Sequence, residues 1–156
     1  MIFVTVGTAR SFERLIKRVD KLGKKYEIII QRGQTKYTPK NCKYFDFIDR
    51  DNFLKYIKKA DVVVTHAGVG AIVTSLTNKK PTVIVPRRKI FNEHKNDHQM
   101  DITKELEDSK IIVACYDIER LEEKILQAKK IKFYLDDKEK KILEKNLKNF
   151  IEGCKK

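Results

Sequence analysis

Short apolar runs alternate along this chain with segments whose apolar residues recur at helical spacing. Several runs, such as the one at 61–65, are rich in valine or isoleucine throughout, as is typical of parallel strands covered on both faces. Strands that alternate with helices form a parallel sheet with helices on both of its faces. The sequence therefore predicts an α/β fold with a Rossmann-like parallel sheet. The predicted strands lie at 2–6, 27–31, 44–47, 61–65, 82–85 and 111–114, and the helices begin near residues 11, 51, 69, 96 and 117.

The chain has 156 residues, which is the usual length of one domain. We expect residues 1–156 to form a single domain with its own hydrophobic core. A capping box at Asp136 and Glu139, followed by an apolar stripe, predicts a last amphipathic helix at about 136–152. Two fates are open for this stripe: it packs back on the domain, or it docks on a membrane-bound partner.

Several sequence features predict a cytoplasmic protein. No apolar stretch reaches the roughly 20 residues of a membrane span, and the first apolar run, at 2–6, is too short for a secretion signal. The three cysteines, Cys42, Cys115 and Cys154, are far apart and form no Cys-x-x-Cys motif. An odd, scattered set of this kind is typical of reduced thiols.

The formal net charge is +13, and the basic excess is uneven along the chain. Residues 9–40 carry ten basic and three acidic residues, and residues 129–156 carry ten and five. Such an excess suits a phosphorylated substrate, an anionic membrane surface or simply a solvated lysine-rich face. Nucleic acid is not an expected partner, because the charge comes with no recognised nucleic-acid motif and no interleaved aromatic residues.

Two loops that follow predicted strands carry glycines at the start of a helix. In the first, Gly7 and Thr8 offer a permissive backbone and a hydroxyl, a combination that can bind phosphate. In the second, His66 precedes Gly68 and Gly70, whose amides would lie at the positive end of a helix dipole and suit a diphosphate. The alternatives are a plain tight turn at Gly7 and a packed strand-end histidine at His66.

A third polar cluster follows the fifth predicted strand and ends at Gln99. His94 and His98 are four residues apart, so they share a face on a helix and could hold a metal with Glu93 or Asp97. The usual Glu-flanked zinc spacing is missing, so we expect no metal site. Hydrogen bonding to a polyhydroxylated ligand fits better, because His, Asp and Gln supply both donors and acceptors. A solvated segment that caps a helix is the alternative.

Taken in order, these loops resemble glycosyltransferase family 28. The resemblance rests on residues 4–8 (VTVGT), 60–70 (ADVVVTHAGVG), 85–87 (VPR) and 93–99 (EHKNDHQ), and it spans about residues 1–125. More narrowly, the chain looks like the soluble subunit of a split MurG-like enzyme, the PssE type of bacterial polysaccharide synthesis. Each motif alone is common, whereas the ordered set is specific.

This resemblance implies the C-terminal, donor-binding half of a GT-B glycosyltransferase. The acceptor-binding half would be a separate, membrane-anchored, PssD-like subunit that recruits this chain to the cytoplasmic face of the membrane. The implied reaction is inverting transfer from a UDP-sugar to a polyprenyl-diphosphate-linked sugar acceptor, without a tightly bound metal or other cofactor. The alternative is a non-enzymatic accessory protein that binds nucleotide-sugars.

The resemblance also implies roles for individual residues. Gly7 and Thr8 match a phosphate-side loop, and Ile48 matches a segment whose backbone reads the uracil edge. A basic side chain such as Arg87 would help to stabilise the leaving diphosphate. The remaining matches are His66, Gly68, Val69 and Gly70 on the diphosphate side, and Glu93, His94, Asp97, His98 and Gln99 on the sugar side.

Two positions bear on the strength of this assignment. Thr74 stands where many relatives carry a glutamate that holds the ribose hydroxyls, and threonine is shorter and uncharged. No side chain stands out as a general base, since His66, the one candidate, fits a phosphate-side or structural role better. In this reading, the partner subunit supplies the base.

Overall fold

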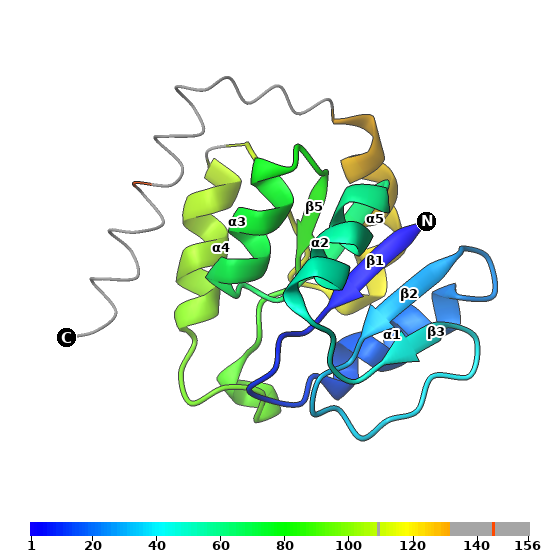
Figure 1. Cartoon of the computed structure of the whole chain (residues 1–156). Coiled ribbons are helices and arrows are strands. Elements are labelled where there is room, and N and C mark those ends of the chain that lie inside the picture. Colours follow the sequence, from blue (N-terminus) through cyan, green and yellow to red (C-terminus); the bar gives the residue numbers. More distant parts are fainter. Residues whose placement is uncertain (109, 132–144, 146–156) are drawn as a thin grey trace.

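The computed structural model describes residues 1–108, 110–131 and 145 (Figure 1). Within them, six parallel strands form one sheet in the order β3-β2-β1-β4-β5-β6. This confirms the predicted α/β fold with a Rossmann-like parallel sheet. The helix predicted at about 136–152 lies outside the described residues, position 145 aside. The strands are β1 (Ile2–Thr5), β2 (Ile28–Gln31), β3 (Lys43–Phe45), β4 (Val62–Thr65), β5 (Thr82–Ile84) and β6 (Val113–Ala114).

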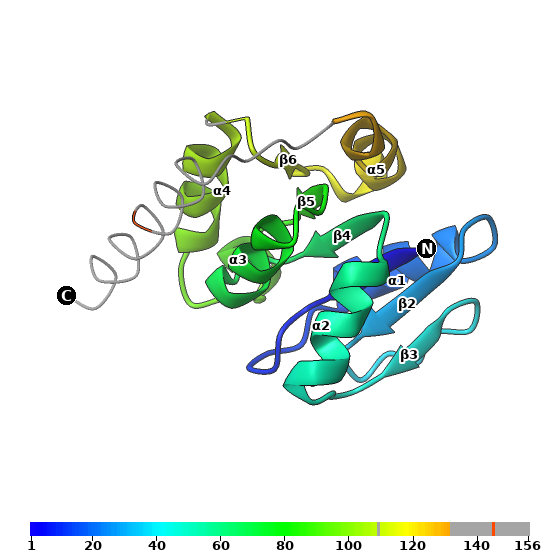
Figure 2. The ribbon, with the colours of Figure 1, turned by 45° about the horizontal axis from the view of Figure 1, so that its top comes forward.

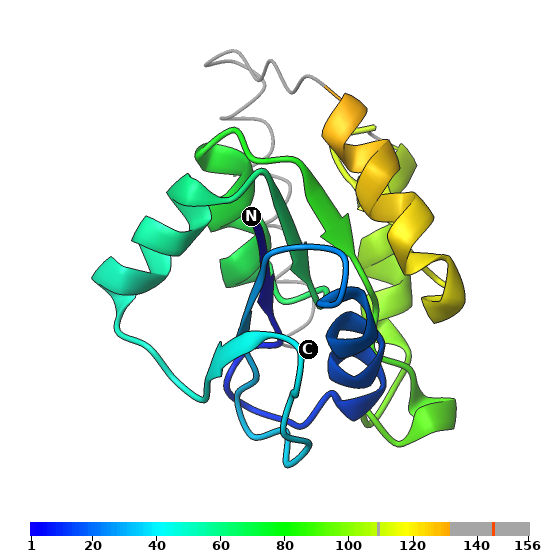
Figure 3. The ribbon, with the colours of Figure 1, turned by 90° about the vertical axis from the view of Figure 1, so that its right-hand side faces the viewer.

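Helices cover both faces of the sheet, as predicted. The helices α1 and α5 pack on one face, and α2, α3 and α4 pack on the other. Figures 2 and 3 show this three-layer arrangement from two further directions. The helical elements are α1 (Glu13–Leu22), α2 (Arg50–Lys59), α3 (Val69–Thr77), the 3-10 turn η1 (Lys89–Phe91), α4 (His98–Asp108), the 3-10 turn η2 (Ile118–Arg120) and α5 (Leu121–Lys130).

The first strand illustrates why its run is apolar at every position. Ile2 and Val4 belong to the core beneath α1 and α5, whereas Phe3 faces α2 on the opposite side. The Phe3 ring lies 5.6 Å from that of Phe53 and 5.4 Å from that of Tyr56, measured between centroids. Because successive side chains of a strand point to opposite faces, a strand covered on both sides needs apolar residues throughout.

The strand order creates a crevice between β1 and β4. These neighbouring strands lie in register, so that Thr5 pairs with Thr65 at their carboxyl ends. The chain leaves β1 towards α1 on one face and leaves β4 towards α3 on the other face. The two loops therefore diverge, and ligands of such sheets bind at this topological switch point.

Candidate functional site

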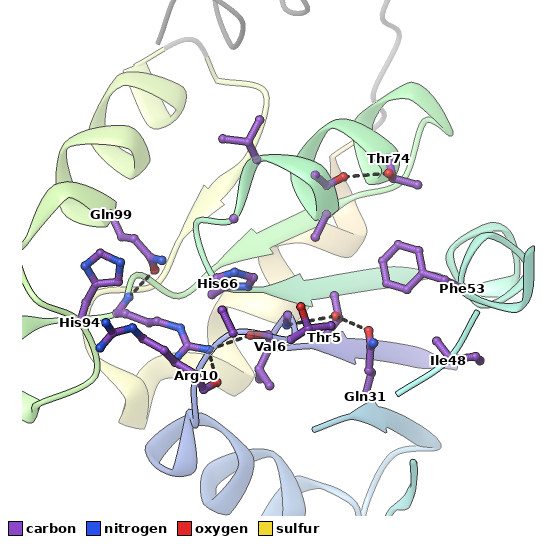
Figure 4. Close-up of a pocket in the computed structure, with 18 of the residues that line it drawn as sticks. Thr5, Val6, Arg10, Gln31, Ile48, Phe53, His66, Thr74, His94 and Gln99 are labelled. Carbon is purple, nitrogen blue, oxygen red and sulfur yellow. Dashed lines mark hydrogen bonds between the residues drawn. The ribbon is translucent and has the colours of Figure 1, made fainter. Parts of the chain in front are cut away.

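A cavity of about 610 Å³ lies at the carboxyl ends of the central strands (Figure 4). Its floor is formed by the ends of β1, β2 and β4, and its walls come from the β1–α1 loop, the start of α3 and residues near α2. Most of the residues singled out in the sequence meet here. Those that line the cavity are Gly7, Thr8, Ile48, His66, Gly68, Val69, Gly70, Thr74, Arg87, His94 and Gln99.

The imidazole of His66 fills the space between the two glycine loops. A Cβ atom added at Gly7 would lie 2.7 Å from His66 Cε1, and a Cβ added at Gly68 would overlap the same ring. Real Cβ atoms essentially never approach that closely, so glycine at both positions makes room for the ring. Gly7 also has a φ of +73°, a conformation that other L-residues rarely adopt. These two glycines and the histidine therefore form one packed unit.

The surroundings of His66 keep its side chain neutral at pH 7. Burial and, to a smaller extent, the nearby guanidinium of Arg87 together lower the pKa of the imidazole to about 4. Nδ1 lies 3.4 Å from the hydroxyl of Thr65. A general base works best when its pKa is close to the working pH, so a pKa of about 4 does not favour that role for His66.

Gly33 packs directly against the β1–α1 loop. Its φ is +57°, and a Cβ at this position would overlap the carbonyl oxygen of Gly7. The amide of Gly33 donates a hydrogen bond to the carbonyl of Asp46. Glycine is thus required at position 33 because the backbone of the β1–α1 loop lies directly against it.

The start of α3 is the strongest anion-binding feature of the cavity. Its first amides have no acceptor within the helix, and no side chain caps them. Gly68 and Gly70 lie at this end, and a Cβ at Gly70 would meet nothing within 4 Å. Open space beside unpartnered amides at the positive end of a helix dipole suits a phosphate group.

Arg87 lines the cavity, but its guanidinium is committed to the protein. It donates to the carbonyls of Val6 at 2.7 Å and Arg10 at 2.8 Å, and also to that of Ser11. Its backbone amide donates to Oε1 of Gln99 at 2.9 Å. Burial lowers the pKa of Arg87 to about 10, so the side chain stays charged at pH 7. Its contacts make it a clamp on the β1–α1 loop.

Three of the predicted sugar-side residues lie outside the cavity lining. Glu93 is buried and pairs with Arg14, with Nε and Oε1 2.7 Å apart. Asp97 accepts a hydrogen bond from the amide of Lys89 at 2.8 Å. His98 begins α4, where its Nδ1 lies 3.6 Å from a carboxylate oxygen of Asp101. The first two hold the β5–α4 loop in shape.

Residues beyond the predicted set also line the cavity. Thr5 and Gln31 end two apolar strands, and the hydroxyl of Thr5 donates to Oε1 of Gln31 at 2.8 Å. A polar residue at or next to the last position of a predicted strand was the signal that could have found them. Arg50 and Phe53 come from α2, a helix that the sequence predicted but did not mark as part of the site. The other additional lining residues are Val6, Ala9, Arg10 and Ala71.

Thr74 lies on the wall of the cavity formed by α3. Its hydroxyl donates a hydrogen bond of 2.7 Å to the carbonyl of Gly70, one helical turn earlier. The hydroxyl can still accept a hydrogen bond from a ligand, but its proton is used within the helix.

Over residues 1–108 and 110–131, no three His, Cys, Asp or Glu side chains converge as metal ligands would. None of the helices in the same residues combines the length and apolar composition of a membrane span.

Comparisons with known proteins find related sequences. The mouse protein UDP-N-acetylglucosamine transferase subunit ALG13 is 33% identical over 118 residues, covering 67% of this chain and 10% of the mouse protein. In Caldicellulosiruptor saccharolyticus, UDP-N-acetylglucosamine--N-acetylmuramyl-(pentapeptide) pyrophosphoryl-undecaprenol N-acetylglucosamine transferase is 29% identical over 153 residues, covering 87% of this chain and 38% of the bacterial protein. The chain therefore spans well under half of either relative.

The fold has a counterpart among solved structures. The crystal structure of the glycosyltransferase of kitacinnamycin superposes with a TM-score of 0.65 at 16% identity, covering 96% of this chain and 38% of that one. The family model for the glycosyltransferase family 28 C-terminal domain matches residues 1–153. The parallel sheet and the cavity at its switch point are consistent with this match, and the chain belongs to the glycosyltransferase family 28 C-terminal domain family.

Proposed function

We propose that this chain is the donor-binding subunit of a two-component glycosyltransferase that uses a UDP-sugar. The observation that carries the proposal is the open start of α3, where uncapped amides and Gly70 border the cavity in a family 28 domain. A diphosphate at this position would be held by backbone amides and the helix dipole. The same contacts would stabilise the negative charge that develops on a leaving UDP.

The remaining lining residues divide into two ends around this point. Ile48, which precedes α2, lies at the same end of the cavity as Phe53 of α2, where a uracil and its ribose would lie. His94 and Gln99 lie at the other end, and we assign them to the donor sugar. Thr74 would contact the ribose as a hydrogen-bond acceptor. Glu93 and Asp97 would contribute through the shape of the β5–α4 loop. His98 begins α4 and, like them, lies outside the cavity lining.

The acceptor side of the reaction would come from a second subunit. The printed name of the bacterial relative describes transfer to a pyrophosphoryl-undecaprenol compound, and that of the mouse relative describes a subunit. The bacterial name supports a lipid-linked acceptor, and the mouse name supports a separate partner subunit. We propose that this partner is membrane-anchored and PssD-like and that it recruits this chain from the cytoplasm. We assign the general base of an inverting reaction to that partner, because a pKa of about 4 would make the imidazole of His66 a weak base.

Thermal unfolding with a panel of nucleotides tests the donor assignment. UDP and UDP-sugars should raise the melting temperature, whereas ADP- and GDP-sugars at the same concentration should not. A ligand at a hundredfold excess over its dissociation constant stabilises the folded state by about 2.7 kcal/mol. No stabilisation by any UDP compound would refute the proposal.

Sugar transfer distinguishes the enzyme from a binding-only accessory protein. The chain alone should bind the donor but transfer little sugar to a polyprenyl-diphosphate acceptor. Membranes that contain the partner subunit should restore transfer only when this chain is added. Transfer by those membranes at the same rate without the chain would favour the accessory role.

A further inference from the structure

The 3-10 turn η1 carries two large apolar side chains into solvent. Ile90 is 72% exposed and Phe91 is 48% exposed, although the chain has many buried positions for such residues. The turn lies between β5 and α4, outside the cavity lining. In Figure 3 it projects from the edge of the molecule next to the start of α1. The pair therefore forms an apolar tip, defined here as Ile90 and Phe91.

Cationic groups surround the apolar tip. The guanidinium of Arg14 lies 4.7 Å from the centroid of the Phe91 ring, and that of Arg88 lies 5.5 Å from it. Lys89 and Lys95 are exposed in the same segment. Positive charge is therefore fixed at the level of the ring, where a cation and an aromatic face attract each other.

Part of this charge has no counter-ion. Arg14 pairs with Glu93, but Arg88, Lys89 and Lys95 form no salt bridge with any residue that the structure describes. Nε of Arg88 is buried and lacks a hydrogen-bond partner among those residues. The exposed carboxylate of Asp97 contacts the backbone amide of Lys89. The rim of the tip thus has a cationic excess.

We propose that the apolar tip is a membrane-contact site that inserts between anionic lipid headgroups. Apolar side chains at an interface enter the boundary of headgroups and acyl chains, while basic side chains beside them meet lipid phosphates. The cations at the tip that lack a salt-bridge partner would be attracted to an anionic lipid surface and not to a neutral one. With its net charge of +13, the whole chain would also be attracted to that surface.

The two side chains of the apolar tip lie outside the lining of the donor cavity. The carboxylate of Glu93 accepts hydrogen bonds from the side chain of Arg14 and from the backbone amide of Arg88, and so it holds the base of the tip in place. Insertion of the tip would hold the carboxyl edge of the sheet, and hence the cavity, close to the lipid surface. Vesicle binding therefore tests the membrane site whether or not the chain binds a UDP-sugar.

Tryptophan fluorescence gives a direct test, because the chain contains no tryptophan. Phe91→Trp places a single reporter in the tip, and Leu126→Trp places a matched reporter on α5, where Leu126 is 43% exposed. With vesicles of phosphatidylcholine and phosphatidylglycerol, the emission of the Phe91→Trp variant should shift to shorter wavelength and be quenched by brominated lipid. The Leu126→Trp variant should change in neither respect. Equal responses of the two variants, or none, would overturn the proposal.

Co-sedimentation of the full chain with the same vesicles measures the contribution of each group. The double variant Ile90→Ser, Phe91→Ser should bind roughly tenfold more weakly than the unaltered chain, and Lys89→Glu should lower binding by about fivefold for each unit of charge lost. Leu126→Ser is the matched control and should bind as the unaltered chain does. Unchanged vesicle binding of the double variant would overturn the proposal. The same holds if that variant no longer binds a protein partner but still binds vesicles as the unaltered chain does.

Discussion

The glycines of the cavity differ in whether they pack against the imidazole of His66. Gly7 and Gly68 are packed against the ring, whereas Gly70 borders open space at the start of α3. Substitutions at Gly68 and Gly70 should therefore have distinct effects on folding and on binding. This separates residues that build the site from residues that leave room for its ligand.

Gly68→Ala should destabilise the fold, because its Cβ would displace the His66 ring. Gly70→Ala should leave stability unchanged or slightly raise it, since alanine is the better helix former. The Gly70→Ala methyl group would nevertheless occupy the space proposed for the diphosphate, so UDP should bind roughly tenfold more weakly, a difference of about 1.4 kcal/mol. Thermal unfolding and titration calorimetry of both variants measure these effects. Unaltered UDP affinity of Gly70→Ala would contradict the assignment of the helix start.

The low pKa of His66 predicts acid sensitivity. Its folded-state pKa of about 4 lies below the value of 6.5 expected of an exposed histidine, so the unfolded chain binds the proton more readily. Stability should therefore fall as the pH drops through 6.5 and towards 4, by on the order of 2 kcal/mol between pH 7 and pH 5. Urea unfolding at the two pH values measures this change. His66→Gln should lose most of this histidine-dependent difference, and an equal pH dependence in the variant would show that other groups cause it.

The segment that follows β5 acts as a brace for the loop that follows β1. Arg87 joins the carbonyls of Val6 and Arg10, while Gln99 of α4 fixes the backbone of Arg87. Arg87 is more than seventy residues away from Val6 and from Arg10 in the chain. A loop proposed to face a diphosphate is thereby held by an element on the opposite side of the switch point.

Arg87→Lys should loosen the β1–α1 loop while preserving the charge. Lysine cannot satisfy three carbonyls with the planar geometry of a guanidinium, so we expect a loss of stability of about 2–3 kcal/mol. Hydrogen exchange at the amides of residues 7–10 should become faster. If Arg87 instead acts directly on the diphosphate, UDP affinity would fall while exchange at those amides stays the same.

The alternation of apolar runs and helical segments predicted the sheet and its two helical layers, because strand burial on both faces leaves a clear pattern. Element ends were less accurate: α2 begins after Asp49, whose side chain caps it at Asn52, and Asp51 lies inside the helix. Both aspartates are good capping residues, and the sequence gives no means of choosing between them.

The site was predicted in outline, since glycines at strand ends and a known motif order mark the loops. The contacts that individual side chains make within the protein were not predicted. Arg87 and Glu93 look like ligands in the sequence, yet the guanidinium of Arg87 holds loop carbonyls, while Glu93 pairs with Arg14. Such contacts span long separations along the chain and depend on the finished fold. Arg50 and Phe53 were missed for the same reason.

The chain spans 38% of the length of the bacterial transferase that it resembles. Its cavity opens at the carboxyl edge of the sheet, and the apolar tip projects beside that edge. A donor site on this chain, an acceptor site on a partner and a lipid surface would thus meet along one side of the domain.

We expect a UDP-sugar to bind in the cavity at the switch point of the sheet. Nuclear magnetic resonance can follow the amide chemical shifts of the isotopically labelled chain during titration with UDP-N-acetylglucosamine. Saturable shifts should be largest at residues 7–10, 48–53 and 68–71, and α5 should be unaffected. The absence of saturable shifts with any UDP-sugar, or shifts centred on α5, would rule out a donor site in this cavity.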